Sequence, residues 1–160
     1  MSKRIGHNRR VALLHEIFPE ARFVVMSRDG RAVARSLLAV DWWPDTHIWW
    51  FGGTPLDWGR AGRDPRDLAA HHWVREVRAI EDGLAVVPES QVHRISYEQL
   101  VAAPRDVISG VAGFAGLRDD DGWQADLGRV RFPNRNGSAD ADERVTAIQT
   151  ATLRALGYAA

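Results

Sequence analysis

Two polar residues, Arg28 and Ser36, stand in a pattern that suits the binding of an anion. Arg28 follows a short apolar run at 22–26, where a buried strand would deliver its guanidinium to the carboxyl end of a sheet. The turn at 27–30 then leads into a helix over 31–38, and Ser36 stands two turns into that helix. A guanidinium fork, a helix N-terminus and a hydroxyl donor together suit a doubly charged phosphate monoester.

The turn between strand and helix holds two residues with expected local roles. Asp29 stands where a carboxylate can accept backbone N–H bonds at the start of the helix. Gly30 is expected to supply the backbone freedom that a tight turn needs. Arginine at a strand end followed by serine eight residues later also arises by chance here, because every basic residue except Lys3 is an arginine. Any mechanism that needs a lysine must therefore use Lys3.

The rest of the chain predicts the elements that would hold this site. Apolar spacing, proline and capping signals predict helices, and one further run of β-forming residues predicts a second strand. The helices are expected over 7–18, 65–84, 104–114 and 143–156, with a helical turn at 97–100 and the strand at 91–96. This alternation favours an α/β fold with a parallel sheet flanked by helices, in a single domain over 1–160.

A tryptophan-rich segment, 41–64, interrupts this alternation. It holds five of the seven tryptophans, four glycines and two prolines, and it shows no clear period. We expect a long ordered loop, which could be a lid over an acceptor, part of the core or an exposed surface. The neighbouring pair His71-His72 is not expected to bind a metal, because adjacent residues point to different faces of a helix.

Composition limits the classes of function. The chain has 160 residues, is 45% hydrophobic and 26% charged, and carries no formal net charge. We therefore expect neither nucleic acid nor a membrane surface as a partner. There is no cysteine, no apolar run long enough to span a membrane and no visible signal peptide, so a cytoplasmic location is expected by default.

Two segments resemble the PAPS-dependent sulfotransferases, which use 3′-phosphoadenosine 5′-phosphosulfate as donor. The stretch Phe-Pro-Glu-Ala-Arg-Phe-Val-Val-Met-Ser-Arg-Asp-Gly-Arg-Ala-Val-Ala-Arg-Ser, 18–36, is similar to their 3′-phosphate-binding segment, closest to the tyrosylprotein and related bacterial branches. The resemblance implies that Arg28 and Ser36 hold that phosphate. The stretch Ile-Ser-Tyr-Glu-Gln-Leu, 95–100, resembles a second family motif and implies that Tyr97 lies beside the nucleotide. Glu98 is expected to pack or cap instead.

The same resemblance implies roles for four more residues. Lys3 falls on the family's lysine near the transferring sulfuryl group, where a cation stabilises the charge on the bridging oxygen. His7 is a weaker candidate for the base that accepts the proton of the acceptor. Arg135 and Asn136 lie where the family's late loop returns to the 3′-phosphate. This chemistry needs PAPS and no metal.

The pattern also departs from the family. Nothing before Arg28 has the Gly- and Thr-rich composition of the loop that cradles the 5′-phosphosulfate, and two predicted strands are few for such a sheet. We therefore expect an N-terminally truncated, partial P-loop-NTPase-like sheet that is catalytically incomplete. A P-loop kinase or NTPase is a poor alternative, because no GxxxxGK[ST] motif is present.

Two functions follow from these features. The first is a sulfotransferase that moves the sulfuryl group of PAPS to a hydroxyl or amine of a small-molecule or peptide acceptor. The alternative is a catalytically inactive remnant that binds a nucleotide or a protein. Half a parallel sheet would leave an open edge, so self-association, or a partner that supplies missing strands, is also expected.

Overall fold

The computed structural model describes residues 2–117, 131–136 and 142–159. The chain divides into two compact units. The first unit comprises Met1–Arg9, Asp29–Gly83 and Asn136–Ala160, and the second comprises Arg10–Arg28 and Leu84–Arg135. The single domain over 1–160 stays a prediction.

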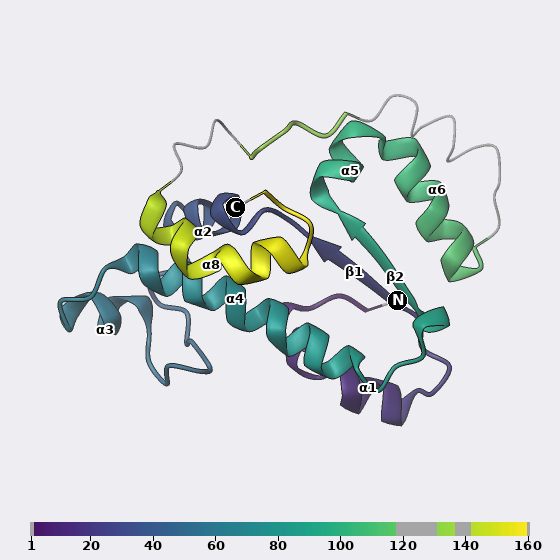
Figure 1. Cartoon of the computed structure of the whole chain (residues 1–160). Helices are drawn as coiled ribbons and strands as arrows, with labels where there is room; N and C mark the ends of the chain where they lie inside the picture. The colour runs from purple at the N-terminus through teal and green to yellow at the C-terminus, as the bar shows by residue number, and fades with distance from the viewer. Residues whose placement is uncertain (1, 118–130, 137–141, 160) are drawn as a thin grey trace. The chain divides into compact units, whose positions relative to one another are not determined.

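The second unit contains the sheet. Strand β1 (Phe23–Ser27) pairs in parallel with β2 (Val92–Ser96), as Figure 1 shows. Phe23 pairs with Val92 at one end of the register, and Ser27 pairs with Ser96 at the other. Because both strands end at the same edge, the residues that follow them, Arg28 and Tyr97, start from neighbouring positions. The predicted α/β fold with a parallel sheet is confirmed.

The second unit also contains helical elements. They are α1 (Val11–Ile17), the 3₁₀ turn η2 (Glu89–Gln91), α5 (Tyr97–Ala102) and α6 (Pro104–Ala115). Helix α5 extends two residues beyond the predicted turn, and Ser96 and Gln99 form a reciprocal capping box at its start. Pro104 opens α6, and Gly116 ends it in the left-handed conformation with a φ of 71°.

The single helix predicted over 7–18 is wrong. The chain instead forms a 3₁₀ helix, η1 (Ile5–Arg9), in the first unit and then α1 in the second. Arg10 separates them, with a φ of −129° and a ψ of 14° that leave the helical region. The apolar spacing of the segment is compatible with both helices, so it gave no signal of the break.

The first unit is mostly helical. Its further helices are α2 (Gly30–Leu38), α3 (Pro55–Arg60), nearly all of α4 (Pro65–Leu84) and α8 (Glu143–Ala155). Its core forms where α2, α4 and α8 meet the tryptophan-rich segment, around Ala34, Trp43, Ile48, Leu68 and Val145. Gly157 follows α8 with a φ of 80°, as expected of a residue just past a helix end.

The tryptophan-rich segment contains a helix that was not predicted. Thr54 accepts a hydrogen bond from the backbone N–H of Asp57, and the Asp57 side chain accepts one from the backbone of Thr54. Pro55 fills the first helical position. This capping box and proline start α3, so the long ordered loop expected over 41–64 contains a short helix.

Candidate functional site

Asp29 starts helix α2 directly after Arg28. Its carboxylate accepts a hydrogen bond from the backbone N–H of Arg31 at 2.9 Å, which confirms the predicted N-cap. Nη2 of the Arg31 guanidinium binds the same carboxylate at 2.7 Å. Burial would raise the pKa of Asp29, but the hydrogen bonds from the side chain and backbone of Arg31 outweigh it and hold that pKa below its ordinary value. The first turn of α2 therefore begins at an ionised carboxylate.

Gly30 is required by a close approach rather than by its backbone angles. A Cβ placed on Gly30 would lie 2.5 Å from Cε3 of Trp73, a residue of α4. The expectation that Gly30 supplies special backbone freedom is wrong. The left-handed glycines among the described residues are Gly52, Gly62, Gly116 and Gly157. Gln149 of α8 also donates from Nε2 to the Gly30 carbonyl oxygen at 3.0 Å, so α2, α4 and α8 meet at this residue.

Three of the predicted site residues lie together in the second unit. The guanidinium carbon of Arg28 is 4.5 Å from the centroid of the Tyr97 ring, and Nη2 of Arg28 donates to the carbonyl oxygen of Arg135 at 2.6 Å. The Tyr97 hydroxyl donates to the carbonyl oxygen of Pro133 at 2.6 Å and accepts from the backbone N–H of Arg135 at 3.0 Å. Tyr97 thus contacts both the Arg28 side chain and the segment 131–136.

This cluster is suited to binding a phosphate. An aromatic ring against its face fixes the plane of a guanidinium, and a fixed guanidinium can donate two parallel hydrogen bonds to a phosphate. The hydrogen bond from Arg28 to the backbone of Arg135 also brings the segment 131–136 beside this guanidinium. The donor set therefore fits the phosphate monoester of a nucleotide, which is the group that the sequence assigned to it.

Ser36 and Asn136 lie in the first unit. Ser36 is exposed on α2. Its neighbour Arg35 donates a hydrogen bond from Nη2 to the carbonyl oxygen of Asn136, which brings the backbone of Asn136 to the helix that carries Ser36. The predicted cofactor residues therefore form two groups, one in each unit. Sequence reasoning missed Arg35, because one arginine among many carries no signal of this contact.

A pocket of about 230 Å³ opens beside α2 in the first unit. Its lining includes apolar residues, among them Ala32 and Val145, and three arginines, Arg31, Arg35 and Arg66. Arg31 and Arg66 are paired with aspartates, which offset their charge. Ser36 is not among the lining residues that the structure describes.

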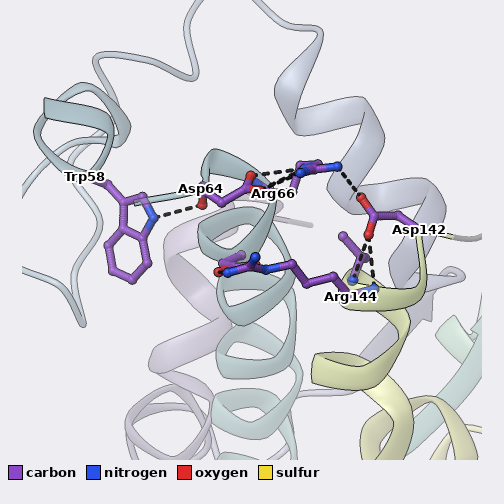
Figure 2. Close-up of polar contacts among 7 residues, drawn as sticks. Trp58, Asp64, Arg66, Asp142 and Arg144 are labelled. Atoms are coloured by element: carbon purple, nitrogen blue, oxygen red, sulfur yellow. Dashed lines mark hydrogen bonds and ion pairs between the residues drawn. The ribbon is translucent and has the colours of Figure 1, made fainter. Parts of the chain in front are cut away.

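A network of ion pairs joins the N-termini of α4 and α8, as Figure 2 shows. Asp142 caps α8 by accepting from the backbone N–H of Arg144, and it also accepts from Nη1 of Arg66 at 3.0 Å. Arg66 binds Asp64 at 2.6 Å, and Arg144 binds Asp67 at 2.6 Å. Hydrogen bonds from the side chain and backbone of Arg66 lower the pKa of Asp64 to about 2. Each helix thus contributes an arginine that pairs with an aspartate of the other.

Lys3 lies in the N-terminal segment of the first unit, and its side chain is exposed. The Ser2 hydroxyl lies 3.0 Å from Nε2 of His7, and the backbone N–H of His7 donates to the carbonyl oxygen of Arg4 at 3.0 Å. The first contact closes a loop that contains Lys3, and the second closes a turn over residues 4–7. The segment therefore has a defined local structure that carries both Lys3 and His7.

The tryptophan-rich segment packs on α4 at His72. The Trp50 indole donates from Nε1 to Nδ1 of His72 at 3.3 Å, and the ring centroids of Trp43 and His72 are 5.2 Å apart. Burial lowers the pKa of His72, the nearby Glu76 raises it and Arg9 lowers it, with a net lowering. Trp43 is 3% exposed, so part of this segment belongs to the core, whereas Trp42 is 55% exposed.

Neither a metal cluster nor a membrane-spanning helix is found in the part of the chain that the structure describes. No three potential ligands among His, Cys, Asp and Glu gather there. No described helix combines the length and the apolar character needed to cross a bilayer.

Comparison with known proteins gives the family. The family model described as "Sulfotransferase family" matches residues 1–121, and the chain therefore belongs to the sulfotransferase family. A solved structure, the sulfotransferase domain from the curacin biosynthetic pathway, is similar with a TM-score of 0.61 at 14% identity. The match covers 96% of this chain and 60% of that domain, so this chain spans three fifths of its length. No curated protein gave a significant match.

The fold is thus that of a sulfotransferase domain, in agreement with the resemblance of the segments 18–36 and 95–100. The particular branch of the family and the N-terminal truncation stay predictions.

Proposed function

We propose that this chain binds PAPS and serves the transfer of its sulfuryl group to a hydroxyl or amine of a small-molecule or peptide acceptor. The observation that carries the proposal is the cluster in which the Arg28 guanidinium stacks on Tyr97 and binds the backbone of Arg135. Residues from three distant positions of the sequence were assigned to one ligand, and they lie together. The cytoplasmic location remains a prediction from the sequence.

Each residue has a distinct part in this proposal. Arg28, with Tyr97 beneath it, and Arg135 would hold the 3′-phosphate in the second unit. The roles of Ser36 and Asn136 remain predictions from the resemblance. When bound, PAPS supplies an activated sulfuryl group. As the acceptor forms its bond to sulfur, the bond between sulfur and the bridging oxygen breaks and 3′-phosphoadenosine 5′-phosphate leaves. Lys3 would offset the negative charge that develops on that oxygen. The proton leaves the acceptor for a base, and His7 is a candidate for it.

A thermal shift with 3′-phosphoadenosine 5′-phosphate tests the binding half of the proposal. At about 100 times its dissociation constant the ligand should stabilise the chain by about 2.7 kcal/mol, which corresponds to a rise of roughly 5–10 °C. Arg28→Ala should abolish the rise. Arg105→Ala, which removes an exposed arginine of α6 in the same unit, should keep it. Adenosine 5′-monophosphate, which lacks the 3′-phosphate, should give little shift. Equal shifts with both nucleotides would overturn the proposal.

A second candidate function, a catalytically inactive nucleotide- or protein-binding module, is favoured by exposed apolar side chains of the second unit. On β1, Val24 is 43% and Met26 52% exposed, and Phe18, just after α1, is 59% exposed. Such side chains suit contact with another polypeptide, either a second copy or a partner that supplies a strand. Nucleotide binding without transfer to any acceptor, together with a concentration-dependent mass in light scattering, would favour this module over the enzyme.

A further inference from the structure

Glu76, on α4, contacts two segments of the first unit at once. Its Oε2 accepts a hydrogen bond from Nδ2 of Asn8 at 2.8 Å, and its Oε1 accepts one from Nε1 of Trp49 at 2.6 Å. Asn8 belongs to η1, and Trp49 belongs to the tryptophan-rich segment. One carboxylate therefore joins both segments to the same turn of α4.

Glu76 is largely shielded from water, which strengthens the effect of losing either hydrogen bond. Its side chain is 13% exposed, and the side chain of His72, one turn earlier, is 14% exposed with Nε2 4.0 Å from Oε1 of Glu76. Hydrogen bonds to a carboxylate are about twice as strong as those between neutral groups, and their loss is costly where water has little access. Because Trp50 donates to Nδ1 of His72, the proton of a neutral His72 lies on Nε2, on the side of Glu76.

The bond to Asn8 reaches the segment that carries Lys3. Arg9, beside Asn8, places its guanidinium carbon 5.1 Å from the centroid of the Trp49 ring, so η1 contacts the tryptophan-rich segment as well as α4. Upstream of Asn8, the contact between Ser2 and His7 closes the loop that contains Lys3. Lys3 itself is exposed, and these contacts tie its segment to the rest of the unit.

We propose that Glu76 is the positioning residue for the N-terminal segment, and that it couples the placement of Lys3 to that of the tryptophan-rich segment. The placement is a matter of this chain's own contacts. Its consequence for turnover rests on the proposed function, in which Lys3 acts at the sulfuryl group. Glu76 touches no reacting group in this scheme and acts through Asn8 and Trp49.

Trypsin provides a readout that does not depend on activity. Lys3, Arg4, Arg9 and Arg10 are cleavage sites within or beside the segment, and the cleavage rate of a folded protein follows the population of its locally opened form. Glu76→Gln replaces one acceptor oxygen with a donor, so one of the two hydrogen bonds is lost. We expect cleavage at these sites, followed by mass spectrometry, to become about tenfold faster. Asp82→Asn removes a negative charge from an exposed position of the same helix and should leave the rate unchanged.

Variants of the two residues that donate hydrogen bonds to Glu76 distinguish a local effect from a general loss of folding. Asn8→Ala removes the bond to η1 alone, and Trp49→Phe removes the indole donor while it keeps an aromatic ring. Asn8→Ala should speed cleavage of the N-terminal segment about as much as Glu76→Gln, at an unchanged melting temperature. If the two hydrogen bonds of Glu76 depend on each other, Trp49→Phe should also speed cleavage of the N-terminal segment, although Trp49 lies far along the sequence. Wild-type cleavage rates in Glu76→Gln and Asn8→Ala would overturn the inference.

A comparison of turnover with nucleotide binding distinguishes a positioning role of Glu76 from a merely structural role. With an acceptor that the wild-type chain sulfates, Glu76→Gln should lower kcat about tenfold or more and leave the shift with 3′-phosphoadenosine 5′-phosphate intact, because Arg28, Tyr97 and Arg135 lie in the other unit. Equal losses of nucleotide binding and turnover would contradict positioning. If the wild-type chain binds no nucleotide but Glu76→Gln and Asn8→Ala are cleaved faster, the positioning role of Glu76 is supported and the proposed function is rejected.

Discussion

The guanidinium carbon of Arg28 lies 4.5 Å from the centroid of the Tyr97 ring, and the same Tyr97 uses its hydroxyl to bind the backbone at Pro133 and Arg135. The ring and the hydroxyl therefore do different things. The ring fixes the plane of a cation that follows β1, whereas the hydroxyl fixes the segment that carries Arg135. Two parallel strands that end together make this meeting possible, because Arg28 follows β1 and Tyr97 follows β2.

Substitutions at Tyr97 should separate these two contributions. Tyr97→Phe keeps a ring beneath Arg28 and removes both hydroxyl contacts, so we expect a roughly fivefold to tenfold weaker affinity for 3′-phosphoadenosine 5′-phosphate by isothermal titration calorimetry. Tyr97→Leu also removes the contact with the guanidinium, which should weaken binding by a further factor of about three. If Tyr97→Phe bound as tightly as the wild type, the segment 131–136 would have no part in the nucleotide site.

Gly30 should tolerate no side chain. In Gly30→Ala the new methyl group would meet the Trp73 ring at 2.5 Å, so the indole or the start of α2 must move. We expect a loss of about 1–3 kcal/mol in the free energy of unfolding, measured by urea denaturation. Gly113→Ala is the matched control. Gly113 is an exposed residue within α6, and a Cβ there would meet nothing within 4 Å. It should be neutral or stabilise the chain by up to about 1 kcal/mol. Equal effects of the two substitutions would contradict the proposed cause.

The predictable parts of the site were those that local sequence specifies. An apolar run followed by Arg28 and a capping Asp29 defines a strand, a turn and a helix start within ten residues, and the structure has all three. The helix α3 also has a local signal, because Thr54, Pro55 and Asp57 form a capping signature within the tryptophan-rich segment. In each case the signal lies within one turn of the residue concerned.

Contacts between distant segments left no such signal. Glu76 looks like any acidic residue of an amphipathic helix, and its partners Asn8 and Trp49 are known only once η1 and the tryptophan-rich segment are placed on α4. The role of Gly30 was misread for the same reason, since the indole that excludes a side chain comes from Trp73 on another helix. The break at Arg10 likewise falls inside an apolar pattern that a continuous helix would also satisfy.

The ion-pair network should stabilise the start of α8 more through capping than through charge. Asp142→Ala removes the cap and the partner of Arg66, and we expect a loss of about 1 kcal/mol in the free energy of unfolding. Arg66→Met keeps an apolar stem and removes the charged guanidinium together with its hydrogen bonds to Asp64 and Asp142. Its smaller effect should fade at high salt, because these groups are partly exposed. Urea denaturation at low and high salt measures both. A salt-independent loss in Arg66→Met would contradict this ranking.

Acid should weaken the same network at Asp64. The pKa of Asp64 is about 2 in the folded chain, below its ordinary value, so its pairing with Arg66 contributes fully above pH of about 4. The contribution is lost as the pH falls from there through about 2. Asp64→Asn should therefore unfold with a shallower acid dependence than the wild type over this range, as followed by circular dichroism. Parallel acid transitions of the two proteins would show that this pair contributes nothing measurable.

His72 should make the first unit sensitive to pH in a higher range. Burial lowers its pKa below the ordinary value of about 6.5, although Glu76 opposes this and Arg9 adds to it. The unfolded chain therefore binds the proton more readily than the folded chain, and the free energy of unfolding falls as the pH drops below about 6.5. Protonation also turns Nδ1 from an acceptor into a donor that faces the Trp50 indole N–H, so the contact between His72 and Trp50 is lost.

His72→Asn tests this link, because its Oδ1 can replace Nδ1 as the acceptor for Trp50 while the side chain no longer titrates. Urea denaturation at pH 7.5, 6.5 and 5.5 should show a larger fall in unfolding free energy for the wild type than for the variant. The other histidines are common to both proteins, so the difference between the two curves isolates His72. Superimposable pH dependence would mean that the His72 imidazole titrates alike in the folded and unfolded chains, and that its contact with Trp50 does not depend on its protonation.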